Sequence, residues 1–386
     1  MKSQANFVFI ERIFALYRKP VLDIIFSKRN FVFFHSVDKR TGIYQTKAAY
    51  SDLIKSFFYG RKDSRMFLFP FKKLFSIRPR IIIHEFSAGI LSIPLVLLFC
   101  RLSNTKLIFW GHMYDRTKGF FPKKSISDKY RLWLWQRADC LIAISQADKK
   151  LLLNHGISEE KVFVSLNTVD TSTLLKIRDD LEKIGKEEIK RQLNLRHQFN
   201  LVFIGRLYRE KRPELLLDII IGLKKMGIES IAVHYIGDGE MNSTLKERVY
   251  ELGLENDVFF HGAVYDDIKA GKILFGCDLM VIPGCVGLSV NHAFCFNCPV
   301  STFQEVDHLP AHGPEIEYII NNRTGFLVPH HSIDTMIKTV KIFLESKELK
   351  NMMRCEIRNF IENECSVEKM ALGVLSAIDH SLTIND

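Results

Sequence analysis

Short apolar runs alternate with amphipathic segments along most of this chain of 386 residues. In the first half, the runs with the length and composition of strands are 31–34, 66–69, 81–84, 106–110, 140–144 and 162–166. Segments with helical spacing of apolar residues, such as 46–58 and 128–137, lie between them. This alternation predicts a parallel sheet covered by helices.

A second alternating series follows a charged segment without strand character at 171–196. Its predicted strands are 200–205, 231–237, 258–261, 279–282, 300–302 and 325–328, and its predicted helices are 214–226, 242–252 and 290–297. We therefore predict an α/β protein with two doubly wound, Rossmann-like domains that face each other across a cleft at the carboxyl ends of their strands. The predicted parts are an N-terminal domain at 1–180, a linker at 181–197, a second domain at 198–365, and a C-terminal helix at 366–386 that packs back on the first domain.

Positive charge is concentrated at the start of the chain. The net charge is +10, but residues 1–80 carry 17 Lys and Arg against 5 Asp and Glu, so the remainder is slightly negative. Aromatic clusters such as 31–34, 57–59 and 67–69 are interleaved with these cations. The pattern fits either a solvated basic face over a Phe-rich core or a surface that contacts anionic lipid headgroups. No recognition motif for nucleic acid accompanies it, and we expect none to bind.

Neither an export signal nor a membrane span is expected. The first residues lack an apolar run that ends at small residues, and the most apolar stretch, 88–100, is interrupted by Pro94 and too short to span a bilayer. The eight cysteines are irregularly spaced, as expected of reduced thiols. The sequence thus predicts a cytoplasmic protein, in peripheral contact with the inner face of the membrane if the basic segment binds lipid.

Two strand-to-loop transitions have the features of a phosphate site. The run that starts at Leu201 ends at Gly205, and Arg206 and Lys211 follow in the turn. The run at 279–282 opens into a glycine-containing loop before a predicted helix. Compact cations and free backbone N–H groups are what an anion requires. Two such turns in one domain favour a phosphorylated ligand.

Several segments, in a consistent order, resemble the retaining family-4 glycosyltransferases, which have the GT-B fold. The turn Gly205-Arg-Leu-Tyr-Arg-Glu-Lys211 resembles the family's G-R-L-x-x-E-K motif. Further matching segments are 143–149, 162–170, 236–240 and 322–328, so the resemblance covers about residues 105–330. It implies two facing Rossmann-like domains and transfer of a hexose from a nucleotide diphosphate sugar with retention of configuration.

The resemblance also implies roles for individual residues. Arg206 and Lys211 would neutralise the leaving nucleoside diphosphate, with Gly205 in the same turn, and would make a metal ion unnecessary. The backbone of Gly287, Leu288 and Ser289 would approach the phosphates. No Asp-x-Asp pair for a divalent cation is present, and we expect neither a metal nor a cofactor.

At one place the chain departs from the family pattern. Aligned on Pro299-Val300, the family's two loop glutamates fall on Gly284 and His292. Asn291 or His292 could hydrogen-bond the ribose instead, although His292 fits an ordinary helix histidine equally well. Glu317 matches the family's single glutamate before the T-G strand. Glu315 lies close to it, and structural loop roles fit both glutamates as well.

The first domain offers candidates on the acceptor side. His112 follows a predicted strand, where the family often carries a histidine near the transferred sugar, so we count it with Arg206 and Lys211 as a catalytic candidate. His84 and Glu85 follow the preceding strand and are candidate acceptor contacts. A loop-capping role for His112 remains the structural alternative.

Other chemistry has weak support. Cys295 and Cys298 have C-x-x-C spacing, and Cys285 lies nearby, but no second pair completes a zinc site. The resemblance therefore implies a metal-independent hexosyltransferase in cell-surface polysaccharide biosynthesis. Its acceptor would be a glycan or lipid-linked oligosaccharide. The alternatives are a nucleotide-sugar epimerase on the same fold and a non-catalytic binding or scaffold protein.

Overall fold

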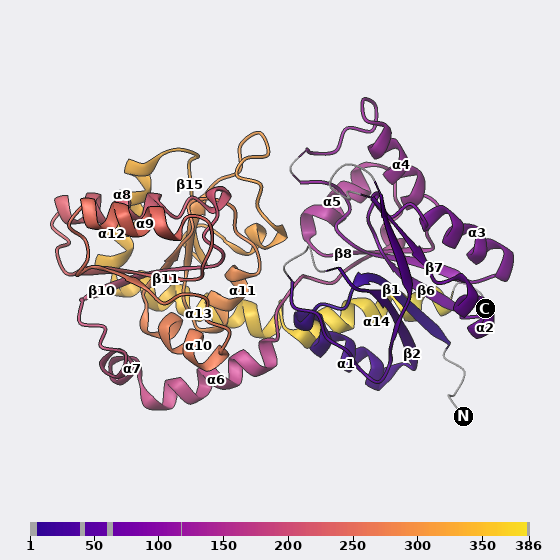
Figure 1. Cartoon of the computed structure of the whole chain (residues 1–386), viewed down its shortest axis with the longest axis horizontal. Helices are drawn as coiled ribbons and strands as arrows, with labels where there is room; N and C mark the ends of the chain where they lie inside the picture. Colours follow the sequence, from indigo (N-terminus) through magenta and orange to yellow (C-terminus); the bar gives the residue numbers. More distant parts are fainter. Residues whose placement is uncertain (1–5, 39–42, 60–64, 117, 384–386) are drawn as a thin grey trace. The chain divides into compact units, whose positions relative to one another are not determined.

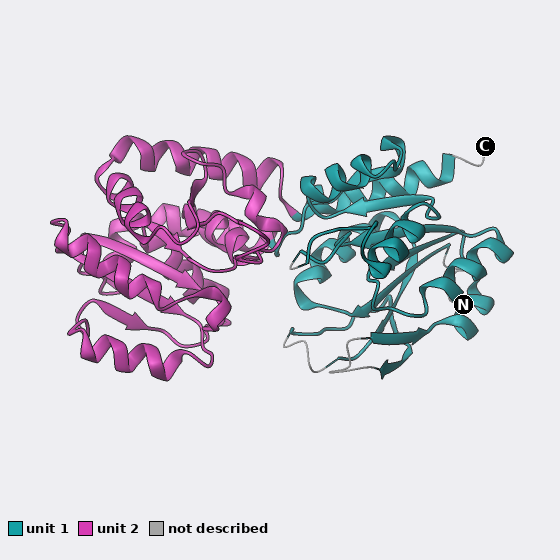
Figure 2. Cartoon of the chain, turned by 90° about the horizontal axis from the view of Figure 1, so that it is seen from above, with its two compact units in different colours: residues 1–170, 367–386 teal, residues 171–366 magenta. Residues whose placement is uncertain are grey.

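The computed structural model describes residues 6–38, 43–59, 65–116 and 118–383. These residues form two compact units (Figure 2). Unit 1 consists of residues 1–170 together with 367–386, and unit 2 consists of residues 171–366. The chain therefore crosses between the units twice, after Asp170 and after Ser366.

Unit 1 is built on a parallel sheet of seven strands. In sheet order these are β3 (Ser51–Leu53), β2 (Phe31–Ser36), β1 (Phe7–Ile13), β6 (Ile81–Glu85), β7 (Lys106–Gly111), β8 (Cys140–Ala143) and β9 (Val162–Val164). The order reverses between β1 and β6. At such a reversal the loops after neighbouring strands diverge and leave room for a ligand.

Helices cover both faces of this sheet (Figure 1). One face packs on α1 (Lys19–Lys28) and α14 (Val367–Thr383), and the other on α3 (Ile93–Ser103), α4 (Ile126–Trp135) and α5 (Gln146–Asn154). Alternate residues of one strand enter the two cores, since Phe7 and Phe9 belong to the first and Val8 and Ile10 to the second. A strand buried on both faces therefore reads as a continuous apolar run.

The predictions for unit 1 differ from the structure in two places. No strand is predicted at β1, an inner strand of the sheet, although its apolar run at 7–10 is as long as the run at 31–34. The pattern also predicts a helix at 46–58, which is wrong, because β3 and β4 (Lys55–Tyr59) occupy this segment. Apolar residues at 50, 53, 54, 57 and 58 fit helical spacing as well as the strand pattern that the structure adopts.

The run at 66–69 forms a strand, β5 (Arg65–Phe69), but not in the parallel sheet. It pairs antiparallel with β4 as a separate two-stranded sheet. The chain then continues through Pro70 into α2 (Phe71–Ile77). The hairpin and α2 pack on the core of unit 1 that contains α3, α4 and α5, since Met66, Leu68 and Leu74 are buried in it.

Unit 2 is built on a parallel sheet of six strands. In sheet order these are β12 (Val258–Phe260), β11 (Ile231–Ile236), β10 (Phe199–Ile204), β13 (Leu279–Val281), β14 (Val300–Phe303) and β15 (Gly325–Val328). One side carries α8 (Leu215–Lys225), α9 (Asn242–Glu251) and α12 (Ile333–Glu345), and the other carries α10 (Asp267–Gly276) and α11 (Ser289–Cys295) (Figure 1). The strand order reverses between β10 and β13.

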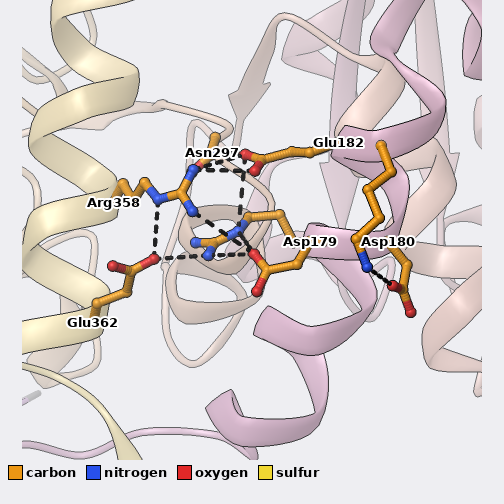
Figure 3. Close-up of polar contacts among 8 residues, drawn as sticks. Asp179, Asp180, Glu182, Asn297, Arg358 and Glu362 are labelled. Atoms are coloured by element: carbon orange, nitrogen blue, oxygen red, sulfur yellow. Dashed lines mark hydrogen bonds and ion pairs between the residues drawn. The ribbon is translucent and has the colours of Figure 1, made fainter.

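The segment predicted as a linker at 181–197 is a folded part of unit 2. It contains the end of α6 (Thr171–Ile184) and all of α7 (Lys186–Gln192), and both helices pack on α10. Helices α6 and α13 (Lys347–Asn363) are also joined to each other, because Arg178 of α6 donates to Glu362 of α13 at 2.7 Å. Arg358, Asp179 and Glu182 extend this ion-pair network (Figure 3).

The C-terminal helix α14 belongs to unit 1. The hydroxyl of Ser165 donates to the carbonyl oxygen of Met370 at 2.8 Å, and Ser381 donates to the sulfur of Cys140 at 3.2 Å. No helix within the described residues combines the length and apolar character that crossing a membrane requires.

Candidate functional site

The candidate donor site lies at the strand-order reversal of unit 2. The loop after β10 begins at Gly205 and the loop after β13 begins at Ile282, and the two strands are direct neighbours. Their carboxyl ends therefore bring both glycine-containing loops of the sequence to the same edge of the sheet. This is the position at which open α/β sheets bind ligands.

The two loops are joined backbone to backbone. The N–H of Gly284 donates to the carbonyl oxygen of Lys211, and that of Cys285 donates to the carbonyl oxygen of Glu210, both at 3.0 Å. A Cβ atom on Gly284 would overlap the carbonyl oxygen of Glu210. The approach is therefore too close for any side chain at position 284, and a carboxylate cannot occupy this position in the observed backbone.

Lys211 reaches from the first loop to the second. Its Nζ atom donates to the carbonyl oxygen of Cys285 at 3.0 Å, and its aliphatic stem lies over Gly205. The side chain is half-buried. Burial lowers the pKa of Lys211, and the neighbouring charge of Arg206 lowers it further, while the charges of Cys285 and Glu315 act in the opposite direction. An anion bound beside this ammonium group would raise its pKa again.

Arg206 is exposed at the mouth of the same turn. Its guanidinium carbon lies 5.0 Å from the centroid of the Tyr208 ring. No carboxylate lies within ion-pair distance of Arg206 or Lys211 among the described residues. Two acids of the same segment could neutralise them, but Glu214 is 3.7 Å from Arg212 and Glu210 forms no ion pair with the described residues. Within the described part of the chain, the two cations are thus not neutralised by an ion pair.

A third loop, after β14, completes the surroundings, and the sequence gives no sign of it. The N–H of Val286 donates to Nδ1 of the buried His312 at 3.2 Å, and Nε2 of His312 lies 3.0 Å from the carbonyl oxygen of Phe303. Because Nδ1 accepts, Nε2 carries the proton and the ring is neutral. His312 therefore holds the loop after β13 against the end of β14.

Glu315 brings a carboxylate to this loop. It lies in the 3₁₀ turn η6 (Pro314–Tyr318) and is only 2% exposed. A Cβ atom on Gly313 would overlap its Oε2 atom, and one on Gly287 would lie 3.9 Å from the same atom. Its charge also acts on Lys211. The glutamate that faces the glycine loop is thus Glu315, while Glu317 is half-buried in the same turn.

The residues at the start of α11 differ in what they can reach. Leu288 is half-buried, and the buried hydroxyl of Ser289 has no hydrogen-bond partner in the described part of the chain. Asn291 is fully buried, and its Nδ2 donates to the sulfur of Cys365 at 3.3 Å. The structure therefore directs Asn291 into the protein interior and gives no support to the expectation that it contacts a ribose. His292 is half-buried, and burial lowers its pKa to about 4, so its ring is neutral at pH 7.

The strand-order reversal of unit 1 carries a second set of polar side chains. Glu85, at the end of β6, accepts from Nε of Arg12 at 2.6 Å and from the backbone N–H of Arg12 at 2.7 Å. Burial opposes ionisation of Glu85, but Arg12 and Arg18 outweigh this effect and lower its pKa. Glu85 is therefore an ionised carboxylate that is already engaged by the protein.

His84 does not belong to this group. It is fully buried, and its Nδ1 donates to the carbonyl oxygen of Glu85 at 2.7 Å, while Nε2 has no partner among the described residues. Successive side chains of a strand point to opposite faces of the sheet, so His84 faces the α3–α4 core while Glu85 faces the other side. His84 as an acceptor contact is therefore wrong.

Glu11, Arg18 and His112 surround the engaged Glu85. Glu11 is buried at the end of β1, with Oε1 3.7 Å from Nη1 of Arg18, whose guanidinium carbon lies 4.4 Å from the centroid of the Trp110 ring. Burial raises the pKa of Glu11 to about 7 although Arg18 opposes the shift. His112 directly follows β7 and keeps part of its surface exposed, but burial of its ring, with the charges of Arg18 and Arg116 nearby, lowers its pKa to about 4.

Sequence reasoning missed Glu11, Arg12 and Arg18 because it missed β1. A carboxylate at the end of an apolar run is the signal that indicates Glu85 in β6, and the same kind of signal is present at 7–11. Among the described residues, no group of three His, Cys, Asp or Glu side chains lies close enough together to hold a metal ion.

Comparison with known proteins links both halves of the chain to glycosyltransferases. Residues 32–173 match the sequence model of Glycosyltransferase Family 4, and residues 185–360 match that of Glycosyl transferases group 1. The uncharacterized glycosyltransferase MJ1069 of Methanocaldococcus jannaschii is 25% identical over 263 residues, which are 67% of this chain and 60% of the relative. The O-antigen biosynthesis glycosyltransferase WbnH of Escherichia coli is 30% identical over 166 residues, 41% of this chain and 40% of WbnH. The chain thus spans less than two thirds of these relatives.

Solved structures support the fold over nearly the whole chain. Anabaena Alr3699/HepE in complex with UDP superposes with a TM-score of 0.68 and 15% identity, covering 97% of this chain and 99% of HepE. The lipopolysaccharide outer core galactosyltransferase WaaB superposes with a TM-score of 0.61 and 16% identity, covering 96% and 99%. The predicted α/β fold of the GT-B class is confirmed, and the chain is a homologue of glycosyltransferases.

Proposed function

We propose that this protein is a glycosyltransferase that moves a hexose from a nucleotide diphosphate sugar to a glycan acceptor with retention of configuration. The observation that carries the proposal is the junction of the two loops in unit 2. It places Lys211, Arg206 and the backbone N–H groups of a glycine loop at one strand-order reversal. This set of groups matches the charge and shape of a diphosphate.

The diphosphate is the part of the donor that these cations would stabilise. Cleavage of a glycosyl–phosphate bond builds negative charge on the departing oxygens, and fixed cations lower that barrier. Arg206 can hold two oxygens in a fork, whereas Lys211 acts as a point charge whose position is set by Cys285. With two cations available, the proposed reaction needs no divalent metal ion or other cofactor.

Glu315 would supply the carboxylate at the sugar. The loop position aligned with the family's first glutamate, Gly284, has no room for a side chain, while Glu315 reaches the same glycine loop from η6. A carboxylate there can accept hydrogen bonds from sugar hydroxyls and limit the net positive charge of the turn. Ser289 and His292 are the side chains on α11 that remain candidates for the ribose and phosphates, and Glu317 keeps a supporting role in the turn.

The acceptor would bind at unit 1. Glu11, Arg12 and Glu85 lie at its strand-order reversal, and His112 is exposed beside them. Charged and imidazole groups of this kind bind the hydroxyls of a glycan through directed hydrogen bonds. The name of WbnH, an O-antigen biosynthesis glycosyltransferase, favours a cell-surface glycan or its lipid-linked precursor. We place the protein on the cytoplasmic face of the membrane, in peripheral contact through its basic N-terminal part.

Ligand binding and turnover test the proposal together. A thermal-shift screen with UDP, GDP, ADP and dTDP should identify one diphosphate that raises the Tm, since a ligand at 100 times its Kd stabilises a protein by about 2.7 kcal/mol. The matching nucleotide sugars are then incubated with and without glycan acceptors, and the anomeric configuration of the product is read by NMR. An inverted product would contradict retention.

The same assay separates the two alternatives. A nucleotide-sugar epimerase would convert the donor alone into a new sugar nucleotide without any acceptor. A binding or scaffold protein would show the thermal shift and no turnover with any donor. Absence of a shift with all four diphosphates would remove the basis of the proposal.

A further inference from the structure

The β4–β5 hairpin presents an aromatic and cationic face to solvent. Its residues alternate along each strand, so that one face packs inward through Ile54, Met66 and Leu68 and the other points outward. In register across the pair, the outward residues are Lys55 opposite Phe69, Phe57 opposite Phe67, and Tyr59 opposite Arg65. Three of these aromatic residues, Phe57, Tyr59 and Phe69, are 58%, 57% and 49% exposed.

The helices next to the hairpin expose a second apolar area. On α3, Leu95, Leu98 and Leu102 are 50%, 52% and 81% exposed and follow helical spacing along one side. Phe75 of α2 is 66% exposed, and its ring centroid lies 5.1 Å from that of Phe99 on α3. The apolar side of α3 therefore continues onto α2.

These two areas belong to one region of unit 1. The N–H of Leu68 in β5 donates to Oγ of Ser92 directly before α3 at 3.0 Å, and the N–H of Leu91 donates to the carbonyl oxygen of Met66 at 2.8 Å. The hairpin also leads through Pro70 into α2. We call the outward residues of β4 and β5, together with Phe75, Leu95, Leu98 and Leu102, the hairpin–α3 surface.

The charged residues within β4, β5, α2 and α3 all have the same sign. None of the residues of β4, β5, α2 or α3 is Asp or Glu. Exposed cations border the surface at Lys55, Arg65, Lys72 and Arg101, and none of them forms an ion pair with the described residues. The nearby Asp52 is 2.7 Å from Lys73, which balances its charge.

We propose that the hairpin–α3 surface docks unit 1 onto a bilayer that contains anionic lipids. Aromatic side chains favour the headgroup level of a membrane, and each Lys or Arg near an anionic surface adds to the attraction. Single exposed apolar residues are normal on proteins, but a contiguous set bordered by one sign of charge indicates a binding surface. A second copy of the chain fits less well, because a symmetric contact would place these cations against one another.

This inference rests on the proposed function for its purpose, since docking would bring the acceptor site of unit 1 to a lipid-linked acceptor. It also concerns residues that the donor site does not use. Binding to vesicles and glycosyl transfer can therefore be measured separately. A protein that does not bind vesicles could still transfer a sugar, and a protein without transferase activity could still bind vesicles, so the two proposals fail independently.

Co-sedimentation with vesicles tests the proposal. The full chain is mixed with vesicles of phosphatidylcholine alone or with 30% phosphatidylglycerol, at about 50 mM and 500 mM NaCl. We expect binding to the anionic vesicles at low salt and little binding to phosphatidylcholine. At high salt, binding to the anionic vesicles should be weaker by about tenfold or more. Absence of binding to the anionic vesicles would overturn the proposal.

Two pairs of substitutions address the charge and the apolar contacts. Lys72→Gln with Arg101→Gln should lower the partition coefficient about 30-fold, at about fivefold for each cation. Leu98→Ser with Leu102→Ser should lower it about tenfold or more. The matched controls in unit 2 are Lys225→Gln, an exposed cation on α8, and Tyr250→Ser, 76% exposed on α9, which should leave binding within about twofold of the parent.

Thermal unfolding of each variant confirms that it is folded, which is expected because all six side chains are exposed. If the control variants in unit 2 lost as much vesicle binding as the variants of the hairpin–α3 surface, the assignment of that surface would be contradicted. Light scattering that shows a dimer abolished by the leucine substitutions, with vesicle binding unchanged, would assign the surface to a second copy. Transfer to a water-soluble acceptor should be retained in all of these variants.

Discussion

The Nζ atom of Lys211 lies 3.0 Å from the carbonyl oxygen of Cys285, so a side chain from the loop after β10 is held by the backbone of the loop after β13. The same two loops share the hydrogen bonds from Gly284 and Cys285 to Lys211 and Glu210. The ammonium position is thus fixed before any ligand arrives. Catalysis gains from such preorganisation, because no reorganisation is needed as charge develops.

Substitution of Arg206 or Lys211 should lower turnover more than substitution of a neighbouring cation in the same turn. We expect Lys211→Ala and Arg206→Ala each to lower kcat/KM about 10²-fold to 10³-fold, the range for loss of one preorganised charge-stabilising group. Arg212→Gln is the control, because Arg212 lies in the same turn but interacts with Glu214 and His331. Initial rates with the identified donor measure all three. A loss in Arg212→Gln equal to that in Lys211→Ala would show that the whole turn, rather than the two cations, is required.

Donor binding should weaken at alkaline pH earlier than an ordinary lysine would allow. Burial lowers the pKa of Lys211 in the free protein, so its ammonium group loses its proton below the usual 10.5. Above that lowered pKa, binding of the diphosphate must be accompanied by proton uptake, and the Kd rises with pH. Calorimetric titration between pH 7 and 10, in buffers of different ionisation enthalpy, measures both effects.

Lys211→Arg is the control for this pH dependence, because a guanidinium group stays charged over the whole range. The variant should show a flatter pH profile and no proton uptake even if its affinity is lower. The same rise of the Kd in Lys211→Arg would contradict the assignment to Lys211.

Glu315 and Glu317 can be distinguished by their effects on transfer and on nucleotide binding. We expect Glu315→Gln to lower kcat about 10-fold to 100-fold while the Kd of the nucleoside diphosphate changes little, because its carboxylate faces the glycine loop where the sugar would lie. Glu317→Gln, an identical chemical change two residues away, should keep most of the activity. Steady-state kinetics measures kcat, and calorimetry measures the Kd of the nucleoside diphosphate, for both variants. The opposite order of effects would restore the role that the family pattern implies for Glu317.

The fold could be predicted from the sequence where local pattern and packing agree. Strands β10 and β13 are apolar runs that end at loops with glycines, and this signal located Gly205, Lys211 and the glycine loop. It failed at 46–58, where the same apolar positions fit two periodicities and the pairing of β4 with β5 decided the outcome. Pairing between strands far apart in sequence is a tertiary effect that a local window does not contain.

The candidate site was predictable only in part for a related reason. His312 and Glu315 act through a loop that packs across the ends of β13 and β14, and nothing in their local sequence indicates that contact. The position of Asn291 in the sequence predicts that it lies in the site, but it lies on a side of α11 from which its side chain reaches Cys365. Sequence spacing predicts which residues belong to a helix or strand, whereas tertiary packing determines the direction of their side chains.

The pKa of Glu11 predicts a pH-dependent stability that a substitution can isolate. Burial raises this pKa from 4.5 to about 7, so the folded state binds the proton more tightly than the unfolded state. The stability contributed in this way is fully present below pH 4.5 and is lost as the pH rises to about 7. Glu11→Gln lacks this loss, so it should gain stability relative to the parent between pH 5 and 8, by up to about 3 kcal/mol.

Glu159→Gln is the matched control with the opposite sign. The pKa of the exposed Glu159 is lowered by its hydrogen bond and charge interaction with Lys149, so the stability it contributes is fully present and constant above pH 4.5 and is lost only as the pH falls below this value. This variant should therefore lose stability relative to the parent over the same range. Urea unfolding at pH 5, 6, 7 and 8 gives both differences. Parallel pH curves for the parent and Glu11→Gln would contradict a raised pKa at Glu11.

The ion-pair network around Arg178 should stabilise unit 2 more than an exposed ion pair does. The side chain of Arg178 is 2% exposed and lies 2.7 Å from both Asp179 and Glu362, which joins α6 to α13. Arg178→Met removes the buried partner of these carboxylates and leaves Arg358, whose side chain is 43% exposed, as the arginine that contacts both of them. We expect it to lower the free energy of unfolding by about 2–4 kcal/mol.

Arg323→Met removes a comparable but exposed ion pair, between Arg323 and Glu356 on α13, whose arginine side chain is 59% exposed. Surface pairs contribute little, so the expected change is below about 1 kcal/mol. Urea unfolding of both variants, followed by far-UV circular dichroism, measures the difference. Because α6 and α13 adjoin the two points where the chain leaves unit 2, Arg178→Met should also increase hydrogen exchange in 171–184 and 347–363, while exchange in the α8 helix stays at the level of the parent. Equal destabilisation by the two substitutions would mean that burial of Arg178 adds nothing to the strength of the network.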